Sequence, residues 1–125
     1  MNHETPLHKV QGLGSAHSGV KHFWRQRVSG ALLAPLVLWF AYTALGLVGA
    51  GPASVLFFLQ TPVNAILMGA FVILCAYHGA LGIREVIEDY IHSDGMKIFL
   101  LLVNRVFAFA VAAIGLIALI RFVVT

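Results

Sequence analysis

The sequence has few charged residues and only one cysteine. Of the 125 residues, 10% are Asp, Glu, Lys or Arg, whereas an average soluble domain has about 25%. Such a chain has too few charges for a surface that faces water. The lone cysteine, Cys75, excludes an intrachain disulfide and a zinc or iron–sulfur site built from several cysteines.

Apolar side chains fill most of the chain instead, with 60% hydrophobic residues and a mean hydropathy of +0.91. A helix that crosses a bilayer needs about 20 mostly apolar residues, and such stretches occupy residues 28–50, 63–86 and 98–120. Each is long and lacks the alternation of a barrel strand. We expect an all-α membrane protein with three transmembrane helices, in which residues 1–27 form an N-terminal segment and residues 28–125 the anchor.

The distribution of basic residues predicts the orientation in the membrane. Before the first span the charged residues are Lys9, Lys21, Arg25, Arg27 and the single acid Glu4. The connection at residues 51–62 has no charge, and the far end of the third span has only Arg121. The positive-inside rule therefore predicts a cytoplasmic N-terminus and a periplasmic C-terminus. The first 27 residues are polar and do not resemble a cleavable signal. The net charge of +3 is then a topology signal, which favours membrane lipid and not nucleic acid as a partner.

His78 is an ionisable residue deep in the second span. A polar group in lipid loses its hydrogen bonds to water and needs a protein, metal or cofactor partner. Gly82, one turn later, leaves room for a flat macrocycle or for a close helix crossing. Asp89 is eleven positions from His78, which places it within about 20° of the same helical face and roughly 16 Å further along the axis. This face therefore has a candidate ligand at depth and an acid near the membrane edge, followed by Tyr90.

Two motifs resemble a known family. The first motif is an H-x-x-x-G pattern, His78 to Gly82, followed by VIEDY at residues 86–90. It is similar to the second helix of the small hydrophobic membrane-anchor subunit of bacterial succinate dehydrogenase, respiratory complex II. The stretches GLGS at residues 12–15 and HFWRQRVSG at residues 22–30 are similar to the segment that leads into the first helix of that family. The resemblance covers nearly the whole chain.

The resemblance implies a multi-subunit complex in the bacterial inner membrane. In it, a flavoprotein subunit oxidises succinate, an iron–sulfur subunit carries the electrons one at a time, and ubiquinone is reduced at the cytoplasmic edge of the membrane subunits. This chain would fix the soluble pair to the membrane, share a haem b with a companion cytochrome b subunit and help to form the ubiquinone site. It has no dicarboxylate site, flavin motif or cysteine cluster, so we expect a subunit outside the catalytic core that cannot catalyse the reaction alone.

The resemblance also assigns roles to three residues of the second span. His78 matches an axial ligand of the haem b iron, the other ligand being a histidine of the companion subunit, and neutral imidazole is a good iron ligand. Tyr90 matches a tyrosine whose phenol hydrogen-bonds a quinone carbonyl oxygen. Asp89 matches its neighbour, which would tune the site or help to deliver protons. The simpler alternatives are an interfacial aromatic anchor for Tyr90 and a solvated helix end for Asp89.

In the first helix, Arg27 matches an arginine close to the haem propionates and the quinone pocket. A guanidinium suits a carboxylate because it donates two parallel hydrogen bonds. Arg27 is in any case a positive-inside marker. Lys21 and His22 could help to bind the same propionates. Ser29 stands where the family commonly has a small hydroxyl residue, and the resemblance assigns it no chemistry.

Three other functions are compatible with parts of the pattern. A fumarate reductase anchor has a similar architecture with the reaction reversed. A structural anchor without haem would have His78 hydrogen-bonded inside the helix bundle. A small transporter or channel subunit needs a polar path across the bilayer, and the first two spans offer only Tyr42, Thr43, Asn64 and His78 at depth, which argues against it.

Overall fold

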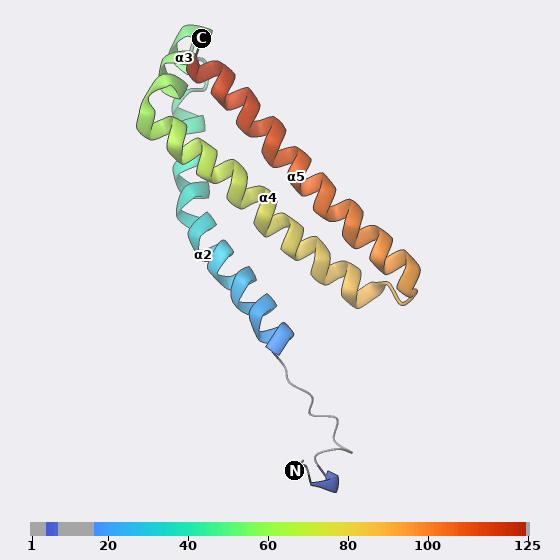
Figure 1. Cartoon of the computed structure of the whole chain (residues 1–125). Coiled ribbons are helices and arrows are strands. Elements are labelled where there is room, and N and C mark those ends of the chain that lie inside the picture. Colours follow the sequence, from blue (N-terminus) through green and yellow to red (C-terminus); the bar gives the residue numbers. More distant parts are fainter. Residues whose placement is uncertain (1–4, 8–16, 125) are drawn as a thin grey trace.

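The computed structural model describes residues 5–7 and 17–124 of the chain (Figure 1). Within residues 17–124 there are four helices and no strand: α2 (His17–Gly46), α3 (Pro52–Gln60), α4 (Pro62–Tyr90) and α5 (Asp94–Val124). Three of them, α2 from Gly19 onward, α4 and α5, are long and apolar enough to cross a membrane. The expected all-α fold with three membrane helices is confirmed. The GLGS stretch at residues 12–15, Lys9 and Glu4 lie outside the described residues.

The helices do not have the same bounds as the apolar stretches. α2 begins at His17, so part of the N-terminal segment before residue 28 is already helical, and it ends at Gly46, before the apolar stretch does. The early end is explained by glycines, because Gly49 has a φ of 79°, a backbone conformation that side chains other than glycine rarely adopt. α4 and α5 contain the whole of residues 63–86 and 98–120 and extend beyond them at both ends.

A short helix, α3, occupies the connection that we expected to be only a link between spans. Pro52 stands in its first turn, where a fixed φ and a missing N–H are well tolerated. Thr61 ends α3 and precedes α4, and its hydroxyl donates a hydrogen bond to the Phe57 carbonyl oxygen at 3.0 Å. α3 packs against both α4 and α5, so the connection is part of the bundle.

α4 is the central helix. It packs against α2 on one side and α5 on the other, and no contact joins α2 to α5 in the part of the chain that the structure describes (Figure 1). The start of α2, the end of α4 and the start of α5 lie toward one end of the bundle, while α3 and the C-terminus lie at the other (Figure 1). We call the first of these the basic end, because it holds Lys21, Arg25, Arg27, Arg84 and Lys97.

The outside of the bundle is apolar. Large hydrophobic side chains are exposed along all three long helices, and the only buried side chains among the described residues are Ile87 and Ser29. A surface of this kind is unfavourable in water and is what a lipid-facing helix requires. The helices approach closely at small residues, since a Cβ added at Gly115 of α5 would lie 2.7 Å from Val72 Cγ1 of α4. The chain is a multi-pass membrane protein.

Candidate functional site

His78 lies on the side of α4 that faces α2, where its imidazole ring is hydrogen-bonded to Ser29. The Nδ1 atom of His78 is 3.0 Å from the Ser29 hydroxyl oxygen, a hydrogen bond that joins positions 49 residues apart. Ser29 is only 3% exposed, so this bond is sheltered from both water and lipid. A polar contact in such a place fixes the ring strongly, because water does not compete for the Ser29 hydroxyl.

The hydrogen bonds of Ser29 identify which nitrogen of His78 bears the proton. The Ser29 hydroxyl donates its single proton to the backbone carbonyl oxygen of Gln26 at 3.1 Å, since a carbonyl can only accept. The Ser29 oxygen must therefore accept its other hydrogen bond from the N–H at Nδ1 of His78. The neutral ring then has its free lone pair at Nε2, which has no hydrogen-bond partner among the described residues.

Gly30 has no side chain, which lets the His78 ring lie directly against α2. A Cβ atom added at Gly30 would lie 3.1 Å from Cε1 of His78 and 3.7 Å from its Nδ1. That spacing is tighter than ordinary van der Waals contact, so any side chain at Gly30 would push the ring away from the helix. Ser29, Gly30 and His78 together form an arrangement that we call the histidine seat. It fixes both the position and the tautomer of the imidazole.

Gly82, one turn beyond His78, also faces α2. A Cβ added there would lie 3.6 Å from Nε2 of the Gln26 side chain. This contact agrees with a packing role of Gly82 against α2, and its role beside a flat macrocycle stays a prediction. The Oε1 atom of Gln26 is buried and has no hydrogen-bond partner. An acceptor that is ready to bind a donor therefore lies beside the histidine seat.

Asp89 and Tyr90 lie at the end of α4. The helix is uninterrupted from His78 to Tyr90, which separates their backbones by about 18 Å along the axis at 1.5 Å per residue. Both side chains are exposed, Tyr90 by 75%. Among the described residues, neither forms a hydrogen bond or ion pair with the other candidate residues. Both residues therefore lie exposed at the basic end of the bundle, well away from the histidine seat along α4.

The candidate residues of α2 lie between these two levels. The pairings of Ser29 with His78 and of Gln26 with Gly82 set the antiparallel register of α2 and α4. In this register Lys21 and His22 lie at the depth of the last turns of α4, while Arg27 lies deeper, near the seat. The Arg27 guanidinium is stacked over the Phe23 ring, 5.0 Å from its centre. Lys21 is exposed and His22 half-buried.

The histidine seat fits a haem better than a bare metal ion. Within the described ranges, no group of three or more His, Cys, Asp or Glu side chains could hold a metal ion. A haem iron can be bound by one neutral imidazole from each of two chains, through a nitrogen lone pair such as that at Nε2 of His78. A hydrogen bond from the other ring nitrogen to a protein acceptor is the usual way to orient such a ligand. The residues of the seat therefore suit a haem whose second ligand comes from elsewhere.

Known proteins match the chain over most of its length. The sequence profile of the family described as succinate dehydrogenase/fumarate reductase transmembrane subunit matches residues 1–112. The chain belongs to this family. A succinate dehydrogenase hydrophobic membrane anchor subunit of Paracoccus denitrificans is 31% identical over 121 residues, which are 97% of this chain and 93% of the relative. No solved structure matches the chain.

Other relatives bear the same description. The succinate dehydrogenase hydrophobic membrane anchor subunit of Rickettsia bellii is 32% identical over 100 residues, 80% of each chain. A succinate dehydrogenase membrane anchor subunit of Reclinomonas americana is 30% identical over 94 residues, 73% of this chain and 78% of the relative. The resemblance of the two motifs to the anchor family is thus confirmed, and a bacterial inner membrane agrees with the Paracoccus and Rickettsia relatives. As a member of the anchor family, the chain works within a complex with other subunits.

The most informative contact of the site involves a residue to which the sequence assigned no role. Ser29 was expected to be only a small hydroxyl at a family position, yet it is the hydrogen-bond partner of His78. A signal was present, because Ser29 and Gly30 form a polar and side-chain-free pair inside an otherwise apolar span. Such a pair is typical of a place where another polar group approaches the helix closely.

Proposed function

We propose that this chain anchors a succinate dehydrogenase in the membrane, supplies His78 as one axial ligand of a haem b and contributes Tyr90 and Asp89 to a ubiquinone-reduction site. The observation that supports the haem ligand best is the histidine seat, which directs the proton of His78 to Ser29 and leaves the Nε2 lone pair free. The second axial ligand comes from a companion cytochrome b subunit. A flavoprotein subunit and an iron–sulfur subunit complete the complex and bind at the basic end.

The residues of this chain orient the ligand and protect it. Ser29 holds Nδ1, Gly30 lets the ring lie against α2, and apolar surface around both keeps water away. A bound haem b with two nitrogen ligands supplies one-electron transfer. Arg27 is the residue best suited to pair with a propionate, since its guanidinium can donate two parallel hydrogen bonds. Lys21 and His22, nearer the membrane edge, add positive charge and a further donor.

Tyr90 and Asp89 are placed to act on ubiquinone. The phenol of Tyr90 donates a hydrogen bond to a quinone carbonyl oxygen, which stabilises negative charge as that oxygen is reduced. The neighbouring Asp89 carboxyl group tunes this site or helps to deliver protons to the quinone. Reduction of ubiquinone to ubiquinol takes two electrons and two protons, and the electrons come from succinate through the flavin and the iron–sulfur clusters. The exposure of both side chains leaves them available to the quinone and to the partner subunits. The positive residues of this end support its location on the cytoplasmic side.

One observation also favours a second function, a structural anchor without haem. In that case the hydrogen bond from His78 to Ser29 would serve only to hold α2 to α4. The two functions differ in what happens at Nε2, because the structural anchor leaves this atom without a ligand. Haem content of the purified complex therefore distinguishes them.

The first test is a reduced-minus-oxidised optical spectrum of the purified complex with His78→Ala, recorded with its flavoprotein and iron–sulfur content. We expect the signal of the b-type haem to weaken or shift. The matched control is His92→Ala, which removes an exposed histidine just beyond α4 and should leave the spectrum unchanged. A haem signal unaffected by His78→Ala would exclude the ligand role. A wild-type complex that holds both soluble subunits but no haem would establish the structural anchor.

The quinone role has a separate test in Tyr90→Phe, which removes only the phenol hydroxyl. Loss of one hydrogen bond worth about 0.5–1.5 kcal/mol should lower succinate-dependent ubiquinone reduction by about twofold to tenfold. Succinate oxidation with a soluble dye should remain intact. Tyr42→Phe, at an exposed tyrosine in the second half of α2, is the control. Equal loss of both activities in Tyr90→Phe would mean failed assembly and would contradict a quinone contact.

A further inference from the structure

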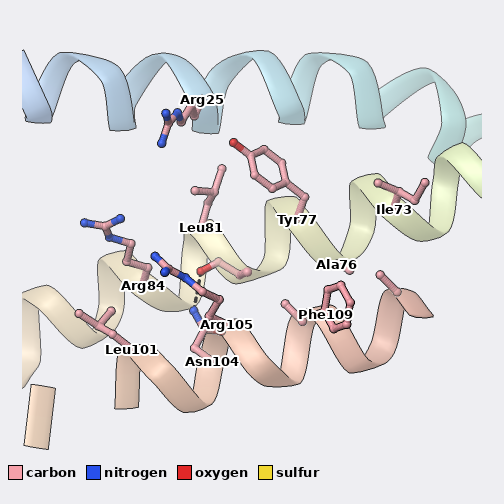
Figure 2. A pocket seen from close by; sticks show the side chains of 13 residues that line it. Arg25, Ile73, Ala76, Tyr77, Leu81, Arg84, Leu101, Asn104, Arg105 and Phe109 are labelled. Carbon is pink, nitrogen blue, oxygen red and sulfur yellow. Dashed lines mark hydrogen bonds between the residues drawn. The ribbon is translucent and has the colours of Figure 1, made fainter. Parts of the chain in front are cut away.

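A groove lined by three arginines lies beside α4, apart from the histidine seat. It has a volume of about 450 Å³ and takes lining residues from all three long helices, but not His78, Asp89 or Tyr90. Arg25 reaches it from α2, Arg84 from α4 and Arg105 from α5 (Figure 2). Because the backbones of α2 and α5 stay apart in the described chain, the groove is the space that they leave beside α4.

The charge of the groove is not balanced. Arg84 is paired with Glu88 of its own helix at 2.6 Å, whereas neither Arg25 nor Arg105 has a hydrogen bond or ion pair with any described residue. No Asp or Glu lines the groove. Two uncompensated guanidinium groups that face one partly enclosed space repel each other and favour an anion between them.

The groove also has an unsatisfied acceptor. Asn104 of α5 donates a hydrogen bond to the Ala80 carbonyl oxygen of α4 at 2.8 Å (Figure 2), and this bond fixes its amide group. The Oδ1 atom of the same amide is buried and has no partner. Asn104 therefore joins α5 to α4 at the groove and leaves one buried acceptor unsatisfied.

Depth and lining identify the ligand as an amphiphile. α4 has 29 residues and is about 44 Å long, whereas the hydrocarbon core of a bilayer is about 30 Å thick. Its last turns, with Arg84, therefore lie at the level of the lipid headgroups. From there the groove continues along apolar and small side chains to Ile73, Phe109 and Ala112, and the step from Arg84 to Ile73 alone covers about 16 Å. A neutral quinone would not need the cations, and a free phosphate would not need the apolar path.

We propose that this groove binds an anionic glycerophospholipid. Arg25 and Arg105 pair with the phosphate, Arg84 adds positive charge at the same level, and an acyl chain follows α4 toward Ile73. The lipid contacts all three long helices and so joins α2 to α5, whose backbones stay apart in the described part of the chain.

The test counts lipids on the whole purified complex by native mass spectrometry. Delipidated wild-type complex receives phosphatidylglycerol and phosphatidylcholine of the same chain length, and we expect it to retain the anionic lipid preferentially. Each arginine near an anionic headgroup is worth about 1 kcal/mol, or about fivefold in affinity. The double variant with Arg25→Gln and Arg105→Gln should therefore bind phosphatidylglycerol about 25-fold more weakly. Lys97→Gln, which removes one positive charge from α5 outside the groove, should have no effect.

Three outcomes would overturn the proposal. Equal retention of both lipids by the wild type would exclude anion recognition, and this comparison needs no variant to fold. Equal weakening by Lys97→Gln and by the double variant would indicate general attraction to the basic end. Displacement of phosphatidylglycerol by inorganic phosphate at comparable concentration would show that the groove takes a soluble anion. The haem spectrum and the content of soluble subunits, measured on the same samples, report separately on the function proposed above.

Discussion

Replacing Ser29 by alanine removes one hydroxyl group and should weaken haem binding without unfolding the helix pair. Ser29 is only 3% exposed, so neither water nor lipid can replace its hydroxyl at Nδ1 of His78. A buried N–H left without an acceptor costs about 1–3 kcal/mol. The ring then regains freedom to rotate and to move its proton to Nε2, the nitrogen that should bind iron. Loss of such a supporting hydrogen bond typically lowers metal affinity by about 10-fold to 100-fold.

The measurement is the transfer of haem from the purified complex to an excess of apomyoglobin, together with the midpoint potential of the haem. Ser29→Ala should release haem faster. Its potential should rise, because the hydrogen bond at Nδ1 makes the ligand more basic and favours the ferric state. The control is Thr43→Ala, whose hydroxyl donates to the Trp39 carbonyl oxygen at 2.9 Å and does not touch His78. This prediction rests on the proposed haem ligand.

Two results would refute the reasoning. Unchanged haem release and potential in Ser29→Ala, in a complex that does lose its haem signal with His78→Ala, would show that the seat does not orient the ligand. Equal effects of Ser29→Ala and Thr43→Ala would show that loss of any hydroxyl in α2 loosens the helix. If neither Ser29→Ala nor His78→Ala changes the haem, the ligand itself has been assigned wrongly.

Two further predictions concern the contact of α4 with α5. Gly115→Ala should destabilise the bundle by about 1–3 kcal/mol, because its Cβ would lie 2.7 Å from Val72 Cγ1. The control is Gly95→Ala on the same helix, whose Cβ would have nothing within 4 Å and should not destabilise it. Equal thermal midpoints of the two variants in detergent would contradict the tight crossing. Asn104→Leu removes the 2.8 Å hydrogen bond to the Ala80 carbonyl oxygen. The loss should lower the stability of the bundle by about 1 kcal/mol, which is measured as a lower thermal midpoint. A stabilised variant would show that the unpaired Asn104 amide oxygen costs more than the hydrogen bond contributes.

The membrane fold could be predicted from the sequence because lipid imposes one simple rule, long apolar helices. The helix ends could not be placed as well. α2 extends back to His17 because polar residues at the membrane edge continue a helix as readily as apolar ones do, and hydropathy does not detect them. α3 was missed for a related reason, since its Pro52 indicates equally a turn and the start of a helix.

The site was predictable in part, and the difference lies in whether a contact is local. His78, Asp89 and Tyr90 share one helix, so their spacing follows from helical geometry alone, and α4 is uninterrupted between them. The partner of His78 is Ser29, 49 positions away, and such a pairing depends on the register of α2 against α4. The arginine groove draws on three helices, and no spacing within one helix could indicate it. The haem and quinone roles of the candidate residues all remain predictions: His78, Asp89, Tyr90, Arg27, Lys21 and His22.

The central place of α4 has a consequence for how the protein is made. Every contact described for His78 comes from α2 and α4, the first two long helices to leave the ribosome. The seat can therefore form as a two-helix hairpin before α5 has been synthesised, and the proposed haem ligand would be in place before the chain is finished. The arginine groove, in contrast, exists only after α5 has inserted, so occupation of that groove would mark the last step of assembly.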